Sequence, residues 1–435
     1  MTPGFAVSFT YSDFYPGTIC TMPDLETALG QYSTPAVIRL CSHFNQLRES
    51  ARFLKDPRIT EWMVKSAFVP DRATKILAGR TEPKRRFVFH RPQLLLIIKA
   101  AASIGKATGG DPVTDPNLGT MGDAFLLANE LLKYDTPRET EEELESNVLV
   151  NFVAIADHLG QSLGSVVVRS VVSTDVLEQY RNDERFREFV DLPAKFESDL
   201  RMTISEYRAA ILVGIIKYVM LKADDITVRG DLIDFIASLA KFPLSKQWFG
   251  STLPPEKVES FLADTSATAA EFVKPCSKAS TVYDFTPFRD KPLLKVEDEY
   301  YPVDTGFLAD KLETGPFWPV QQILKDSDRL RSLAFWGRIF EGYISWLLTE
   351  CLGNQRNVFL ANPLFRSKKN EIREICDGFV KCGSFLAMLE CKGGFFDRAA
   401  KYGGNAAKLR QTIEEKLIKT GQGEKRGIEQ LLIYS

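Results

Sequence analysis

Hydrophobic residues recur at helical spacing through much of the chain between Pro35 and about Ala240. A period of three to four residues is typical of helices that turn one face toward a core. The pattern therefore predicts a mainly α-helical region over residues 1–280. The helices are expected in the following segments: Ala36–Phe44, His90–Lys99, Met121–Leu132, Glu141–Leu159, Val176–Val190, Ser205–Leu221 and Asp231–Ala240.

The pattern changes near residue 280. Pro292–Val303 predicts two short strands around an acidic turn, and Asp304–Leu312 a short helix. We expect this β-containing segment, 281–325, either to connect two domains or to begin the second one. The chain has 435 residues, and domains usually contain ~100–200 residues, so two or three domains are expected.

The last part of the chain, 326–435, alternates between the two periods. The pattern predicts a helix, a strand, a β-hairpin around residues 381–383, a second helix and a final strand. Their expected ranges are Asp328–Leu352, Asn357–Asn362, Ile372–Val380, Ser384–Lys392, Asn405–Lys419 and Gly427–Tyr434. The chain is thus expected to be multidomain, with a helical region followed by an α/β domain in the order α-β-β-β-α-β.

Cysteine and histidine usage excludes two classes of small domain. The seven cysteines have irregular spacing with no CxxC pair, and there are only three histidines. A zinc finger or a disulfide framework is therefore not expected. His90, directly before Arg91-Pro92, is expected to be a capping or surface residue rather than a catalyst.

The sequence predicts a cytoplasmic protein with reduced thiols and no membrane partner. Its first residues lack a basic segment followed by an apolar run, so no secretory signal is expected. The longest apolar run, near Ala209–Leu221, contains Lys217 and is shorter than the ~20 residues that cross a bilayer.

Charge is distributed unevenly along the chain. The formal net charge is −2, but residues 353–435 contain 15 Lys+Arg against 9 Asp+Glu. A basic C-terminal part on an acidic body favours a polyanionic partner at that end. A charged, solvated surface is the alternative interpretation.

One group of charged residues in the C-terminal part suggests chemistry. Asp377 lies in the first strand of the expected hairpin, and Glu390 and Lys392 lie in the second. Residues two apart in a strand share a face, so Glu390 and Lys392 point the same way. A turn at 381–384 would put Asp377 opposite about Met388, close to Glu390. Two carboxylates and an ammonium group thus meet on one face.

The surroundings of these residues favour a metal site. Phe385–Leu389 is a continuous apolar run, as expected for a strand buried on both faces. Charged groups at the end of such a strand are costly to bury unless they are paired or bind a metal. Converging carboxylates repel each other, and hard oxygen ligands suit Mg²⁺ or Mn²⁺. The alternative is an ordinary Glu–Lys salt bridge on an exposed hairpin.

Residues 374–378 (EICDG) and 389–393 (LECKG), together with the element order, resemble the PD-(D/E)xK, or restriction-endonuclease-like, nuclease superfamily. The resemblance covers roughly residues 325–435. Cys376 stands where the family motif has proline. The resemblance implies a restriction-endonuclease-like core with a central mixed sheet and magnesium-dependent hydrolysis of phosphodiester bonds.

The resemblance also implies roles for individual residues. Asp377 and Glu390 would bind the metal together with the carbonyl of Cys391, and Lys392 would be the catalytic lysine. Glu341 matches a glutamate on the first helix that assists metal binding in the family. Gln430 resembles a polar residue near the site in some members.

Basic residues near the second helix are candidates for contact with nucleic acid. Lys401, Lys408 and Arg410 lie in or just before that helix, and the first two would share a face if it began early. They can contact phosphates, which supply affinity rather than sequence reading. A solvated helix face is the alternative.

The expected function is that of a metal-dependent endonuclease, with DNA favoured over RNA. A role in prokaryotic antiviral defence or in mobile-element biology is an analogy only. The alternative is an inactive nuclease-like scaffold that binds nucleic acid or serves in assembly or sensing. The helical region is expected to select substrate, sense a signal, or bind a protein partner or a second copy of the chain.

Overall fold

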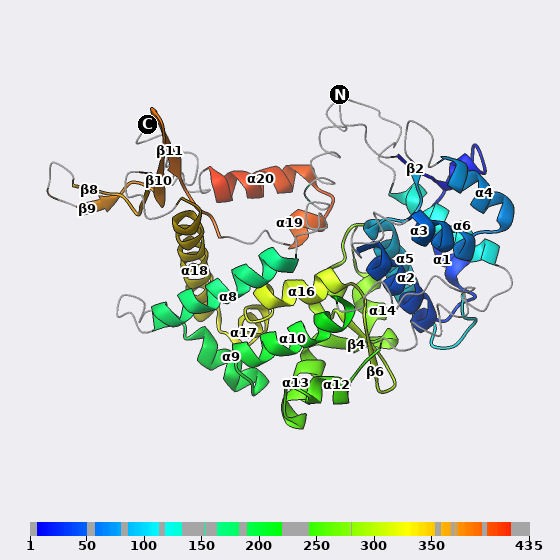
Figure 1. The fold of residues 1–435 in the computed structure, drawn as a ribbon, viewed down its shortest axis with the longest axis horizontal. Helices are drawn as coiled ribbons and strands as arrows, with labels where there is room; N and C mark the ends of the chain where they lie inside the picture. Colours follow the sequence, from blue (N-terminus) through cyan, green and yellow to red (C-terminus); the bar gives the residue numbers. More distant parts are fainter. Residues whose placement is uncertain are drawn as a thin grey trace. The chain divides into compact units, whose positions relative to one another are not determined.

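The computed structural model describes most of the chain, and Figure 1 shows its elements. The described residues are 7–49, 57–79, 86–112, 118–132, 153, 163–181, 189–219, 243–279, 281–352, 358–366, 370, 372–393 and 398–418. The helices expected at Glu141–Leu159 and Asp231–Ala240 and the strand expected at Gly427–Tyr434 lie outside the described residues, apart from Val153.

The chain groups into two compact units, each discontinuous in sequence. Unit 1 comprises Met1–Glu141, Ala154–Gly160 and Leu200–Leu312. Unit 2 comprises Glu142–Val153, Gln161–Asp199 and Glu313–Ser435. The domain boundaries expected at residues 280 and 325 stay predictions.

The N-terminal half of unit 1 is built around one buried helix, α5 (Arg91–Ile104). Its sequence is apolar on nearly every face, and all residues from Gln93 to Ala102 are buried. Helices α1, α2, α6 and α14 pack against it. The surrounding elements are β1 (Val7–Ser8), the 3₁₀ helix η1 (Tyr11–Asp13), α1 (Met22–Leu29), α2 (Thr34–Glu49), α3 (Pro57–Ala67), α4 (Pro70–Gly79), β2 (Arg86–Phe87) and α6 (Leu118–Leu131).

Both ends of α5 are defined by local chemistry. His90 is the N-cap residue, and its Nδ1 accepts a hydrogen bond from the backbone N–H of Gln93 at 3.4 Å. Gly105 ends the helix with φ +66°, a left-handed conformation that favours glycine. The expected capping role of His90 is therefore confirmed.

The C-terminal half of unit 1 adds a small mixed sheet with the strand order β3-β6-β5-β4. Strands β4 and β5 are parallel, and the other pairs are antiparallel. The elements are α10 (Ile204–Val219), β3 (Leu244–Ser245), α12 (Lys246–Gly250), α13 (Pro255–Thr265), β4 (Ser266–Thr268), α14 (Ala269–Ser277), α15 (Thr286–Asp290), β5 (Leu293–Val296), β6 (Glu299–Pro302) and α16 (Thr305–Thr314). The two strands expected in Pro292–Val303 are confirmed, with Glu297 in the turn at φ +54°.

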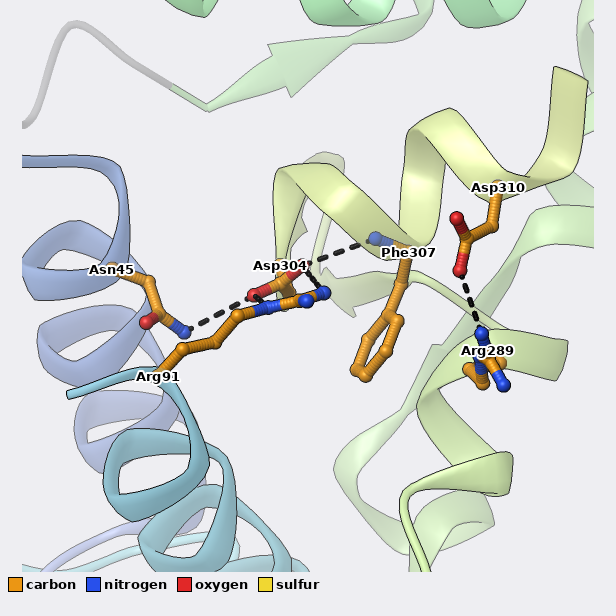
Figure 2. Close-up of polar contacts among 6 residues, drawn as sticks. All are labelled: Asn45, Arg91, Arg289, Asp304, Phe307 and Asp310. Atoms are coloured by element: carbon orange, nitrogen blue, oxygen red, sulfur yellow. Dashed lines mark hydrogen bonds and ion pairs between the residues drawn. The ribbon is translucent and has the colours of Figure 1, made fainter. Parts of the chain in front are cut away.

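A buried ion pair joins distant segments of unit 1 (Figure 2). The Arg91 guanidinium donates to both carboxylate oxygens of Asp304, at 2.8 and 2.6 Å. Asn45 Nδ2 and the backbone N–H of Phe307 also donate to Asp304, at 3.3 and 3.0 Å. Burial opposes ionisation of Asp304, but the Arg91 guanidinium and the Phe307 N–H hold its pKa below the ordinary value. The carboxylate is therefore charged and saturated with donors.

In unit 2, helices α8 (Leu163–Arg181) and α18 (Asp326–Leu352) pack against each other. They approach closely at Gly342, where a Cβ atom would lie 2.7 Å from Val176 Cγ1. Helices α9 (Leu192–Leu200) and α17 (Trp318–Ile323) are shorter. The helix expected at Val176–Val190 coincides in part with α8, which begins earlier, at Leu163. Residues 182–188 of that expectation lie outside the described residues, and residues 189 and 190 are not helical.

The strands of unit 2 form two small sheets in the described part of the chain. A three-stranded antiparallel sheet has the order β11-β10-β7, and β8 pairs with β9 in a separate ribbon. The elements are β7 (Phe359–Ala361), β8 (Leu364–Arg366), β9 (Ile372–Glu374), β10 (Gly378–Cys382), β11 (Phe385–Leu389), α19 (Arg398–Tyr402) and α20 (Ala406–Leu417).

The strand expected at Ile372–Val380 is wrong as one continuous element. It is split between β9 and β10, which pair with different partners. The three residues from Ile375 to Asp377 lie between these strands, and Cys376 there is buried. The helix expected at Asn405–Lys419 is confirmed as α20, with Asn405 Oδ1 accepting from the Lys408 N–H at 2.9 Å. No helix in the described residues is long and apolar enough to cross a membrane.

Candidate functional site

The β10–β11 hairpin brings Asp377 and Glu390 opposite each other. Gly383 in the tight turn has φ +63°, which a residue with a Cβ atom rarely adopts. Pairing then runs from Cys382 with Phe385 to Gly378 with Leu389. Continued by one step, this register puts Asp377 opposite Glu390. The residue opposite Met388 is Phe379, so the expected register was wrong by two residues, in the direction that brings the carboxylates closer together.

Backbone and side-chain contacts hold these two carboxylates in place. The Cys391 N–H donates to Asp377 Oδ2, and the carbonyl of Asp377 accepts from the Asn362 N–H at 3.0 Å. Lys392 Nζ donates to Glu390 Oε1 at 2.5 Å. The Glu390 side chain is 11% exposed and that of Lys392 is 33% exposed. In the Glu390–Lys392 pair, the carboxylate is thus mostly buried and the ammonium group is accessible to solvent.

The thiol of Cys391 reports the electrostatic character of the site. Burial raises its pKa to about 11, and the negative charges of Asp377, Glu341 and Glu390 act in the same direction. Burial also raises the pKa of Cys376, again with contributions from Glu390 and Asp377. Both thiols are therefore neutral at neutral pH, which argues against a thiolate nucleophile here. Three carboxylates contribute to one negative potential.

Glu341 reaches this region from helix α18. Its side chain is 27% exposed and accepts from Arg338 Nη1 at 2.7 Å. The neighbouring residue Phe340 packs against the backbone after Lys392, since a Cβ atom on Gly393 would lie 2.8 Å from Phe340 Cβ. The expectation that Glu341 is partly buried is thus confirmed. Arg338 was not expected, although its spacing of three residues from Glu341 is a recognisable helical signal.

The donor set of this site suits a hard divalent cation through carboxylate oxygens. Asp377 and Glu390 are opposed when the register is continued by one step, and the backbone carbonyl of Cys391 directly follows Glu390 in sequence. Among the described residues, however, no three His, Cys, Asp or Glu side chains are grouped closely enough to hold a metal ion. Two carboxylates would therefore have to be completed by backbone oxygen and water.

The surroundings of β11 differ from those expected. Phe385 is 78% exposed and Leu386 59% exposed, so the strand is not buried on both faces along its length. Only Met388 and Leu389, next to the site, are half-buried. In the described sheet β11 is an edge strand beside β10 alone. An apolar strand is buried on both faces only if other elements cover both faces. The sequence of the strand alone does not show whether such elements are present.

The basic candidates lie on two separate helices. Lys401 is in α19, which ends at Tyr402, and α20 starts anew after Asn405. Gly404, at φ +69°, lies between them. The helix that contains Lys408 does not begin early enough to include Lys401, so the two residues do not share a face of one helix. Lys408 and Arg410 are exposed on α20. Gln430 lies outside the described residues.

Comparisons of the chain with protein-family models, with curated proteins and with solved structures found no match.

Proposed function

We propose that the chain is a metal-dependent nuclease whose C-terminal part has a restriction-endonuclease-like core, with DNA favoured over RNA as the substrate. The observation that carries this proposal is the register of the β10–β11 hairpin. It places Asp377 and Glu390 opposite each other, with Lys392 on Glu390 and the Glu341 carboxylate contributing to the same negative potential.

Each residue then has a distinct role. Asp377 and Glu390 would hold a magnesium or manganese ion with the carbonyl of Cys391, and Glu341 would assist directly or through water. Such a cation, when bound, polarises the phosphate and lowers the pKa of a coordinated water. The Cys391 N–H orients the Asp377 carboxylate by donating to Oδ2. Gln430 stays a predicted member of this set.

Lys392 is placed to handle a water molecule or a phosphate oxygen. Its ammonium group lies 2.5 Å from Glu390 Oε1, and its side chain is 33% exposed. A cation in that position stabilises the negative charge that develops on a phosphate during hydrolysis. When Glu390 binds a metal, the same ammonium would be available to orient the attacking water.

Exposed positive charge supports a polyanionic substrate. Lys408 and Arg410 are exposed on α20, and residues 353–435 contain six more basic than acidic side chains. Charges of this kind attract the phosphate backbone without reading its sequence. Lys401 is half-buried in α19, with its ammonium 5.7 Å from the centre of the Tyr402 ring. We therefore rank Lys408 and Arg410 above it as phosphate contacts.

The direct test is cleavage of nucleic acid by the purified full-length chain. Supercoiled DNA, linear DNA, single-stranded DNA and RNA would be incubated with Mg²⁺, with Mn²⁺ or with a chelator. We expect metal-dependent cleavage that falls at least about 100-fold in Asp377→Asn, Glu390→Gln and Lys392→Met, a loss of about 3 kcal/mol of transition-state stabilisation. Lys381→Met and Glu414→Gln change exposed residues of β10 and α20 and should retain full activity.

Two outcomes would contradict the proposal. One is cleavage by Glu390→Gln and Lys392→Met at the wild-type rate, which would mean a contaminating nuclease or another site. The other is the absence of metal-dependent cleavage of all four substrates. The second outcome would favour the alternative of an inactive scaffold, provided that the protein still binds nucleic acid in a mobility-shift assay.

The inactive alternative has one observation in its favour. Glu390 is already paired with Lys392, and Asp377 already accepts from Cys391, so the carboxylates have partners without a cation. Such a saturated arrangement can serve as a structural element in an assembly or sensor protein. Metal binding distinguishes the two functions. If the chain is a nuclease, calorimetry with Mn²⁺ should show heat of binding for the wild type and none for Asp377→Asn. If it is an inactive scaffold, neither protein should bind Mn²⁺.

A further inference from the structure

Unit 2 contains a cavity beside helix α18. It has a volume of about 340 Å³ and is lined by residues of α8, the end of α16 and α18. This volume is at the lower end of the ~300–1,000 Å³ that ligand pockets usually have. The cavity can therefore hold a molecule the size of a nucleoside.

The apolar wall of the cavity is an aromatic stripe on α18. Trp336, Phe340 and Tyr343 line it, and their spacing of four and three residues puts them on one face of the helix. The Trp336 ring packs against the ring of Phe317, with ring centres 4.9 Å apart. Aromatic walls of this kind favour planar, π-rich ligands, which stack on them.

The polar end of the cavity is electrically neutral. Arg169 and Glu313 line it as a two-pronged ion pair, with Arg169 Nη2 donating to Glu313 Oε2 at 3.0 Å. The hydroxyl of Ser173 is also in the lining. Burial raises the pKa of Tyr343, so its phenol stays protonated at neutral pH. A carboxylate beside a guanidinium, with hydroxyls nearby, matches the alternating donors and acceptors on the edge of a neutral heteroaromatic ring.

The cavity shares one residue with the surroundings of the candidate site. Phe340 forms part of its wall and also packs on the backbone at Gly393, next to Lys392. Glu341 follows Phe340 in the chain. A ligand that stacks on Phe340 would therefore be separated from the backbone next to Lys392 only by the Phe340 side chain.

The geometry points to a nucleobase as the occupant of this cavity. A base is planar, is neutral at physiological pH and presents adjacent donors and acceptors, which are the three properties that the walls and the polar end select. The choice of a base over other heteroaromatic rings rests on the proposed function. Binding itself requires no cleavage. The base can belong to a free nucleoside or to a strand of the substrate.

Binding is tested with the full-length chain in the presence of a chelator, so that no cleavage occurs. Adenosine, guanosine, cytidine and uridine would each be titrated up to about 1 mM by calorimetry. Short single-stranded DNA would be titrated alongside an otherwise identical strand made of abasic residues. Ser173→Trp fills the cavity, whereas Val171→Trp changes a residue of the same helix that is 52% exposed and does not line the cavity.

We expect binding by the wild type and Val171→Trp and its loss in Ser173→Trp. Phe340→Ala, which removes one stacking surface, should weaken binding at least about tenfold. Binding of a nucleoside assigns the cavity to a free ligand. A preference for the base-containing strand over the abasic one, lost in Ser173→Trp, assigns it to the substrate.

Two results would overturn the assignment. They are no measurable binding of any nucleoside or base-containing strand, and binding that is unchanged in both Ser173→Trp and Phe340→Ala. Because these measurements use no metal, they can fail while cleavage succeeds. Equally, nucleoside binding can succeed in a chain that does not cleave, which keeps the cavity and the nuclease proposal separable.

Discussion

Two ion pairs, one in each unit, differ in how deeply they are buried and in how many hydrogen-bond donors surround the carboxylate. This difference separates a structural role from a chemical one. In unit 1 the Arg91 side chain is 9% exposed and that of Asp304 is fully buried. Arg91, Asn45 and the backbone of Phe307 donate to Asp304, and Figure 2 shows these donors converging on one carboxylate. In unit 2 Lys392 is 33% exposed, and its partner Glu390 lies one step beyond the last residue pair of the hairpin strands, across from Asp377.

The difference lies in what each pair can still do. The Arg91–Asp304 pair is held in one arrangement by its neighbours. The Phe307 ring packs against Arg91 and Arg289, with its centre 4.8 and 5.8 Å from the two guanidinium carbons. Such a pair gives little net stability over apolar packing, but loss of one partner leaves a buried charge. The Glu390–Lys392 pair has solvent on one side and like charges nearby, so a ligand can rearrange it.

The largest expected effect comes from breaking the buried pair. Asp304→Ala leaves the Arg91 guanidinium without its carboxylate, and the free energy of unfolding should fall by about 3–5 kcal/mol. Denaturant unfolding of the purified chain measures it. Asp111→Ala is the matched control, since its pair with Arg39 is more exposed (38% and 37%) and should be worth at most about 1 kcal/mol. Equal losses in the two variants would remove the distinction.

Acidification should weaken the same part of unit 1. His90 directly precedes Arg91, and burial lowers its pKa from 6.5 to about 4. The unfolded chain therefore takes up this proton near pH 6.5, whereas the folded chain does not until about pH 4. Stability is full above pH 6.5 and falls as the pH decreases, by about 2 kcal/mol at pH 5.

His90→Asn keeps a capping side chain and removes the titrating group. Comparison of unfolding at pH 7.5 and pH 5 should show a smaller pH dependence in this variant than in the wild type. If the two proteins lose the same stability on acidification, the buried imidazole is not the cause.

Loss of one partner of the Glu390–Lys392 pair should change the stability of the protein much less than loss of Asp304. Glu390→Ala removes a carboxylate that faces Asp377, so relief of repulsion offsets the lost contact with Lys392. We expect a change of no more than about 1 kcal/mol in the free energy of unfolding. A loss comparable to that of Asp304→Ala would show that the Glu390–Lys392 pair is structural.

The smallest effect is expected at the exposed end of β11. Phe385 is 78% exposed, so Phe385→Thr should change the free energy of unfolding by less than about 0.5 kcal/mol. Leu409→Ala in α20, where the side chain is fully buried, is the contrasting variant and should cost about 2–5 kcal/mol. If Phe385→Thr unfolds the protein to a similar extent, the Phe385 side chain makes contacts that its exposure does not reveal.

The sequence by itself determined features that depend on neighbouring residues. The helical spacing and the cap at His90 predicted α5, and the apolar pattern around an acidic turn predicted β5 and β6. The apolar runs around residues 381–383 predicted the hairpin of β10 and β11, although with a register wrong by two residues at Asp377. These features follow from backbone geometry and side-chain periodicity, which act over a few residues and are readable along the chain.

Only the tertiary structure decided which surfaces are covered and which distant residues meet. It split Ile372–Val380 between two sheets, left Phe385 exposed, and separated Lys401 from Lys408 at a break between helices. It also paired Arg91 with Asp304, which are 213 residues apart. Burial and long-range pairing depend on how the elements pack together, and one stretch of sequence contains no information about the element that will cover it.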